Sequence, residues 1–62
     1  MSIVLIDIEH DSAGHRWTLW SKGNYQYEVE NRKTGYKVPI DASQYEDSLE
    51  TARMIFRKYV AG

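Results

Sequence analysis

Two kinds of hydrophobic spacing divide the 62-residue chain. Up to residue 41, β-branched and aromatic residues form short runs separated by turn residues, which is typical of antiparallel strands. We expect strands at about 2–10, 15–22, 25–30 and 36–41. From about residue 48, apolar residues recur every three or four positions and predict one helix over about 47–60. The predicted fold class is α+β, a single domain (1–62) with a four-stranded antiparallel β-meander and one C-terminal helix packed on one face (β-β-β-β-α).

The turns predict how these strands pair. A two-residue loop at 23–24 would place Trp20 opposite Tyr27 and Thr18 opposite Val29. In the next hairpin, we pair the strands so that residues on the same face of the sheet lie opposite each other. One face of the sheet, which we assign to the core beneath the helix, then holds Thr18, Trp20, Tyr25, Tyr27, Val29, Tyr36, Val38 and Ile40. The last strand carries Pro39, which cannot donate a ladder hydrogen bond, so we expect this strand at an edge of the sheet.

The first strand predicts an apolar surface on the other side of the sheet. A four-residue loop at 11–14 would pair Ile8 with Trp17 and Ile6 with Leu19. Five residues then share the face opposite the helix and form a candidate protein interface: Val4, Ile6, Ile8, Trp17 and Leu19. A monomer rarely exposes so many large apolar side chains together. The register of 2–10 stays open, because a slip of one residue exchanges its faces, and the sheet could instead curl so that the first strand covers this surface.

Composition limits the function classes. A chain this short buries only about 60% of its unfolded surface, so it needs very good packing or self-association. It has no cysteine, which excludes disulfides and cysteine-based metal sites. The net charge is −1, and acidic and basic blocks alternate along the chain, so we expect surfaces of mixed sign. Without an export signal or a membrane-spanning run, the expected location is the cytoplasm, including a host cytoplasm if the gene belongs to a phage.

Catalytic and metal-binding patterns are weak. His10 and His15 could meet across the first turn near Asp11, but two histidines and no third ligand at a fixed spacing do not define a metal site. Ser12 lies near both histidines on a turn that offers no evident oxyanion donors. We therefore expect no metal, no cofactor and no enzymatic activity.

The first functional hypothesis is a small protein-interaction module, which acts as a regulator, an inhibitor or an accessory subunit, or as a homodimer of that kind. Trp17 lies at the centre of the candidate interface, and tryptophan is enriched among interface anchors. The size and economy of the chain are similar to those of phage-encoded inhibitors of host or defence proteins.

The alternative hypothesis is nucleic-acid binding. The order Trp20-x-x-Gly23-x-Tyr25-x-Tyr27, followed by Thr34-Gly35 and a helix, resembles the layout of phage-integrase arm-binding and plant AP2-type domains. Sheet-plus-helix modules that bind single strands by aromatic stacking offer a second analogy. The candidate phosphate contacts are Arg16, Lys22, Arg32, Lys33 and Lys37. The negative net charge and the expected inward direction of the tyrosines favour the first hypothesis.

Overall fold

The computed structural model describes residues 2–62 and contains four strands followed by one helix. The strands are β1 (Val4–His10), β2 (Arg16–Gly23), β3 (Gln26–Asn31) and β4 (Lys37–Asp41), and the helix is α1 (Ser48–Ala61). All neighbouring strands pair antiparallel in the order β1-β2-β3-β4. The predicted β-β-β-β-α meander is confirmed, and β4 with Pro39 lies at an edge as expected.

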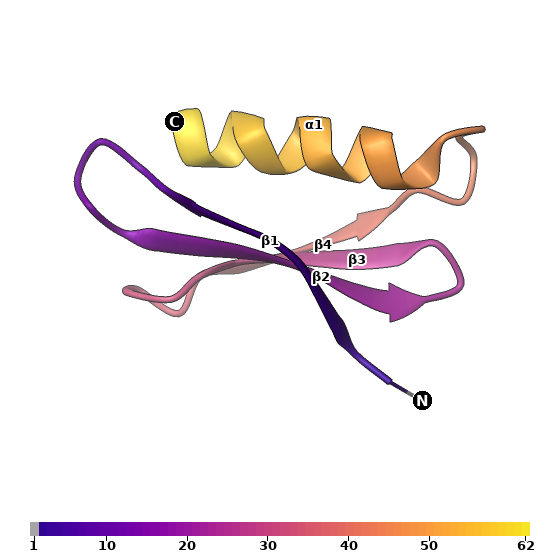
Figure 1. Cartoon of the computed structure of the whole chain (residues 1–62), viewed down its shortest axis with the longest axis horizontal. Coiled ribbons are helices and arrows are strands. Elements are labelled where there is room, and N and C mark those ends of the chain that lie inside the picture. Colours follow the sequence, from indigo (N-terminus) through magenta and orange to yellow (C-terminus); the bar gives the residue numbers. More distant parts are fainter. Residues whose placement is uncertain (1) are drawn as a thin grey trace.

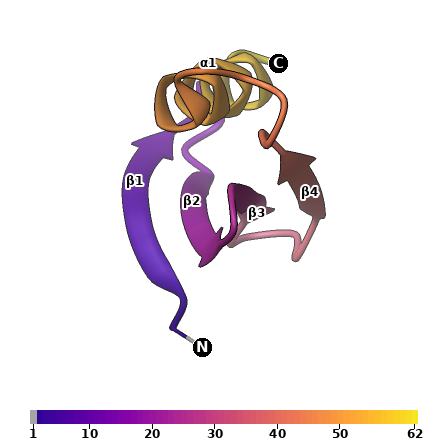
Figure 2. The ribbon, with the colours of Figure 1, turned by 90° about the vertical axis from the view of Figure 1, so that its right-hand side faces the viewer.

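The helix lies across one face of a strongly twisted sheet (Figures 1 and 2). Its main contacts are with β1 and β2. It begins after Asp47, whose carboxylate accepts a hydrogen bond from the backbone N–H of Glu50 at 3.2 Å and so satisfies one otherwise unpaired donor. The twist carries the N-terminal half of β1 away from the helix, and the opposite face of the sheet has no covering element among residues 2–62 (Figure 1).

The core lies between α1 and the helix-facing side of the sheet. Phe56, Leu19 and Val29 are the largest fully buried side chains. The complete buried apolar set is Trp17, Leu19, Tyr27, Val29, Ile40, Ala42, Ala52 and Phe56. Tyr27, Val29, Val38 and Ile40 face the helix as expected, whereas Trp17 and Leu19 do so against expectation.

The β2–β3 hairpin explains why β2 presents the opposite face from the one expected. Asn24 and Tyr25, with φ of 53° and 62°, form the two-residue loop, where residues 23–24 had been expected. That change alone shifts the pairing of β2 with β3 by two residues, so each side chain of β2 would keep its expected face. A bulge at Lys22 then adds one residue to β2, so Leu19 pairs with Val29 and Trp20 pairs with Glu28. The expected pairing of Trp20 with Tyr27 is therefore wrong, and Trp20 and Thr18 lie on the uncovered side.

The expected core positions of Tyr25 and Tyr36 are also wrong. In the β3–β4 hairpin Val29 pairs with Val38, where Tyr36 had been expected, and this shift by two leaves the faces of β4 unchanged. Tyr36 lies before β4 and is 54% exposed, and Tyr25 is in the β2–β3 turn and is exposed as well. Neither tyrosine is a core residue.

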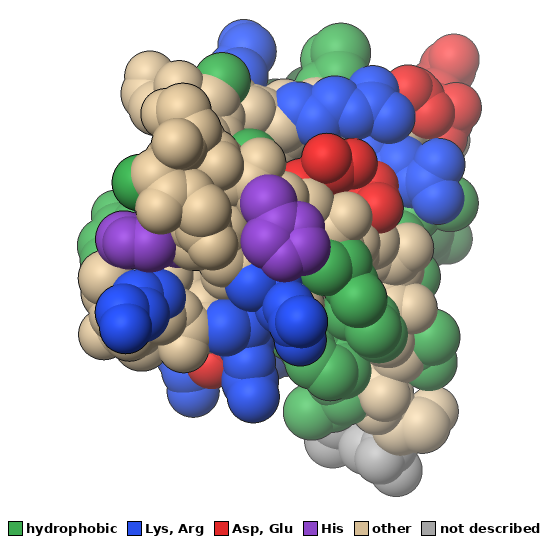
Figure 3. Space-filling model, turned by 60° about the vertical axis from the view of Figure 1, so that its left-hand side comes forward, with side chains coloured by type: hydrophobic (Ala, Val, Ile, Leu, Met, Phe, Trp, Pro, Cys, Tyr) green, Lys and Arg blue, Asp and Glu red, His purple; other side chains and the backbone are tan. Residues whose placement is uncertain are grey.

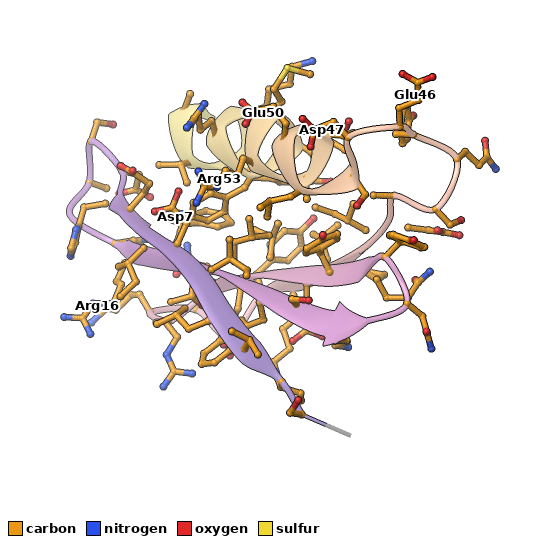
Figure 4. All side chains as sticks on the ribbon, turned by 45° about the vertical axis from the view of Figure 1, so that its right-hand side comes forward. Asp7, Arg16, Glu46, Asp47, Glu50 and Arg53 are labelled. Atoms are coloured by element: carbon orange, nitrogen blue, oxygen red, sulfur yellow. The ribbon has the colours of Figure 1, made fainter. Side chains whose placement is uncertain are left out.

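β1 is shifted by one residue relative to the expected register. Asp11 and His15 close the first turn through an Asp11 N–H bond to the His15 carbonyl at 3.0 Å, so the loop has three residues, not four. Asp7 therefore pairs with Leu19 and Glu9 with Trp17, and a bulge at Ile6 turns that side chain towards the core. Figure 4 shows Arg53 of α1 directed towards Asp7. The guanidinium group of Arg53 therefore brings a positive charge to the side of the sheet that this carboxylate faces.

We predict that Leu19→Ala lowers the free energy of unfolding by about 2–5 kcal/mol, because it leaves a cavity beneath the helix. Leu5→Ala, on the uncovered face, should cost about 1 kcal/mol, since Leu5 is 42% exposed. Urea denaturation at neutral pH measures both. Equal costs for the two variants would contradict the observed register of β2.

Candidate functional site

The uncovered face of the sheet collects side chains that alternate away from the helix. Its central pairs are Ile8 with Thr18, Leu5 with Trp20, Trp20 with Glu28, and Thr18 with Glu30. The same alternation adds Lys37 and Pro39 from β4 and the end pair His10–Arg16. We call this surface the uncovered face, and it consists of Leu5, Ile8, His10, Arg16, Thr18, Trp20, Glu28, Glu30, Lys37 and Pro39.

Trp20 forms an apolar platform at the centre of the uncovered face. Its indole Nε1–H donates to the hydroxyl of Thr18 at 2.9 Å, so the ring lies along its own strand and shields Thr18. Leu5 and Ile8 flank it on β1 and are both exposed, and Ile3 lines a shallow hollow with Trp20. This half of the face is apolar and open to solvent.

The β3–β4 half of the uncovered face is charged but internally paired. Lys22 contacts Glu28 at 2.9 Å, and Glu30 contacts Arg32 at 3.0 Å and Lys37 at 4.0 Å. Such exposed pairs add little stability, about 0–1 kcal/mol each. Their effect here is to neutralise both glutamates, so the excess charge around the apolar platform is positive.

A basic hollow lies at the end of the sheet where β2 begins. Its volume is about 490 Å³, and its lining residues are Ala13, Gly14, His15, Arg16, Arg32 and Lys33. Figure 3 shows Lys and Arg side chains gathered beside the two histidines, next to a band of hydrophobic side chains. Figure 4 shows Arg16 extending away from the ribbon, with Glu46 on the opposite side of the view. Arg16, Arg32 and Lys33 make this hollow locally basic.

The structure divides the predicted protein interface. Trp17 is 8% exposed and Leu19 is fully buried, so both belong to the core, and Ile6 packs against it. Val4 and Ile8 are exposed, but Val4 follows the helix-facing alternation and Ile8 lies on the uncovered face. The expectation that these five side chains share one open face is wrong. The bulge at Lys22 turns Trp17 and Leu19 towards the helix, and the bulge at Ile6 separates Val4 and Ile6 from Ile8.

The predicted phosphate contacts are partly brought together. Arg16, Arg32 and Lys33 line the basic hollow, and Lys37 lies near them on the uncovered face through its contact with Glu30. Lys22 lies apart, at the other end of β2, where it contacts Glu28.

The sequence interpretation missed Leu5, Trp20 and Asp11. Asp11 is the organising residue of the first turn: one carboxylate oxygen accepts from the backbone N–H of Ala13 (2.9 Å) and His15 (2.8 Å). The other accepts from the Trp17 indole at 2.9 Å. An aspartate at the start of a turn commonly binds the backbone two residues on, and that signal would have given the shorter loop.

These hydrogen bonds lower the pKa of Asp11. The bond from the Trp17 indole favours the charged carboxylate most, the backbone N–H groups and nearby His15 add to it, and partial burial opposes it. The pKa of Asp41 is also lowered, by bonds from the Ser43 hydroxyl (2.7 Å) and backbone (3.0 Å) and from Gln26 (3.0 Å). Both aspartates act as charged acceptors that hold turns together.

Neither histidine belongs to a metal-binding group. Within residues 2–62 no group of three or more His, Asp or Glu side chains could hold an ion. Across the same range, no helix is long and apolar enough to span a bilayer.

No known family model, curated protein or solved structure matches the chain.

We predict that Asp11 links low pH to the loss of the first turn. Its folded pKa lies below the ordinary 3.8, so its stabilising contribution is present above about pH 3.8 and is lost as the pH falls through the lower folded value. The Trp17 indole N–H resonance should move with that titration, whereas the Trp20 indole, bound to a hydroxyl, should not.

An NMR titration from pH 7 to pH 2 measures this, and Asp11→Asn is the control that should abolish the Trp17 transition. A Trp17 resonance that moves in the same way in Asp11→Asn would contradict this link.

Proposed function

We propose that the protein is a non-enzymatic interaction module that binds another protein through the uncovered face, as a regulator, an inhibitor or an accessory subunit. The observation that carries this proposal is the apolar row on the side of the sheet opposite the helix, formed by the exposed Leu5 and Ile8 and the half-buried Trp20. In so small a domain the single helix covers one face, and apolar groups left on the other gain free energy when a partner removes them from water.

The chemistry of the surface favours a partner with an apolar centre and an acidic rim. Trp20 supplies a large aromatic surface that its bond to Thr18 holds in place, and a preorganised anchor loses little entropy on binding. Arg16 and Lys37 lie at the border of the face, and the two glutamates on it are paired with basic side chains. Acidic groups on a partner would meet this excess of positive charge.

Two aspartates, Asp11 and Asp41, are structural acceptors and not candidates for a general base. Asp11 and Asp41 have lowered pKa values because they accept several hydrogen bonds, whereas a general base works best with a pKa near the operating pH. Both are committed to turn structure.

Trp20→Ala should weaken partner binding by at least about tenfold, because it removes the central anchor. The matched control is Tyr45→Ala, which truncates an exposed aromatic in the β4–α1 connection, away from the uncovered face. Affinity capture from cells of the source organism, with quantitative mass spectrometry, should identify a protein that the wild type and Tyr45→Ala retain and Trp20→Ala loses. Light scattering of the purified chain over a range of concentrations tests for a second copy as the partner.

The proposal fails if Trp20→Ala, shown to be folded, retains the same proteins as the wild type. A concentration-dependent doubling of mass that Trp20→Ala abolishes would identify the partner as another copy of this chain.

Nucleic-acid binding is the second candidate, supported by the convergence of Arg16, Arg32 and Lys33 on one hollow and by the half-buried Trp20 on the uncovered face. Phosphate groups could occupy that hollow while bases stack on the indole. The net charge of the chain is −1, whereas nucleic-acid-binding domains are usually clearly basic, and this is why we place the candidate second.

If the second candidate holds, affinity for random single-stranded DNA should fall steeply between 50 and 200 mM salt. Arg16→Ala and Lys33→Ala should each weaken binding without sequence preference and reduce the salt slope by about one. Fluorescence anisotropy with labelled single- and double-stranded oligonucleotides measures this, with Lys58→Ala as a charge control on the helix. Absence of binding at 50 mM salt would contradict the nucleic-acid role.

A further inference from the structure

The basic hollow brings three permanent cations to one place. Arg16 comes from the start of β2, and Arg32 and Lys33 come from the turn after β3. Among residues 2–62, no acidic side chain lines the hollow. Cations that converge on one point suit a single compact group with more than one negative charge, whereas a row of separate anionic groups would be matched by cations spread along a track.

Two backbone contacts hold these cations in position. The Arg32 N–H donates to the Arg16 carbonyl at 2.8 Å, which joins the start of β2 to the turn after β3. The buried Asn31 closes that turn, because its side-chain oxygen accepts from the Lys33 N–H at 2.9 Å and from the Thr34 N–H at 3.1 Å. The backbone positions of the three cations are therefore fixed before an anion arrives, and binding has to order only their side chains.

The charges of the hollow remain available to a ligand. Within residues 2–62, neither Arg16 nor Lys33 has a carboxylate within ion-pair distance. Arg32 contacts Glu30 at 3.0 Å through Nη1. Since a guanidinium has five N–H donors, this contact leaves donors on its other nitrogens for an anion.

Arg16 connects the basic hollow to the uncovered face. It lines the hollow, and in the alternation of β2 it shares a side with Thr18 and Trp20. Figure 3 shows the basic group directly beside a band of hydrophobic side chains. Four residues of a strand span about 13 Å, which is the distance along β2 from Arg16 to Trp20. One extended segment of a partner is therefore long enough to reach both the apolar row and the hollow.

We propose that the protein bound by the uncovered face carries a phosphorylated side chain, and that its phosphate monoester occupies the basic hollow. A phosphate monoester is close to a dianion at neutral pH and offers three strong acceptor oxygens, which the forked donors of arginine match. A carboxylate brings only one charge, and the phosphodiesters of a nucleic acid bring one charge each along a backbone. This inference rests on the proposed function, since it names the chemistry of the partner of that same face.

Two synthetic peptides test the hollow in NMR chemical-shift titrations of the full chain. The first has phosphoserine at its centre, leucine four positions away on each side and glycine elsewhere, and the second has unmodified serine at the centre. The two leucines make the test independent of the direction in which the peptide lies. The phosphopeptide should bind at least about tenfold more tightly, with shifts centred on residues 13–16 and 32–33.

Arg16→Gln should weaken binding of the phosphopeptide by about tenfold, because it removes a charged donor from the hollow. Arg57→Gln, which removes an exposed arginine of α1 outside the hollow, should leave binding unchanged. Trp20→Ala should cost roughly threefold, since an open face covers only part of a leucine side chain. That loss should disappear when the phosphopeptide has glycine in place of both leucines. Arg16 is exposed, so its variant stays informative if Trp20→Ala fails to fold.

The proposal is overturned if the two peptides bind equally, if Arg16→Gln and Arg57→Gln have the same effect, or if a folded Trp20→Ala loses nothing. A thymidine dinucleotide with one phosphodiester and no terminal phosphate is titrated in parallel. Binding of this dinucleotide as tight as that of the phosphopeptide would assign the hollow to nucleic acid and also overturn the proposal. None of these results changes which proteins the uncovered face captures, so failure of the phosphate site and failure of the proposed function are separate outcomes.

Discussion

The carboxylate of Asp11 is the contact on which most of the remaining arrangement depends. It accepts from two backbone N–H groups of the first turn and from the Trp17 indole at the same time. The backbone bonds set a three-residue loop and with it the register of β1. The indole bond holds Trp17 on the helix side, where it joins the core and supports Tyr36. One side chain thus couples strand register to core packing, and a chain with so small a core has few other ways to specify either.

How far the sequence predicts this structure depends on the kind of information required. The number, type and order of the elements follow from hydrophobic periodicity and turn residues, and those predictions are confirmed. Which side of each strand is buried depends on whether turns and bulges add an odd or an even number of residues. The β3–β4 turn differed by two, so Val38 and Ile40 were placed correctly. The bulge at Lys22 shifted the β2–β3 register by one, so Trp17 and Trp20 exchanged faces, and the shorter first turn shifted the pairing of β1 by one.

The division of aromatic residues between two sides gives this small domain two separate surfaces. Trp17 and Trp20 are three positions apart on one strand, yet one supports a groove under the helix and the other the uncovered face. The sheet between them is a single layer, in which the fully buried Leu19 lies between the two tryptophans in sequence. The same hydrogen-bonded ladder therefore orients both surfaces, although each presents different chemistry to its surroundings.

The bulge at Lys22 has a consequence for how the sequence can change over evolutionary time. Loss or gain of two residues in this hairpin would shorten or lengthen the turn, and the same side chains of β2 would still face the helix. Loss of the single bulged residue would reverse β2, carrying Leu19 to solvent and Trp20 beneath the helix. In related chains, whether this hairpin has an odd or an even number of residues should therefore be conserved more strictly than the identity of those residues. Lys22, whose side chain makes a surface ion pair, is the bulged residue that sets this number.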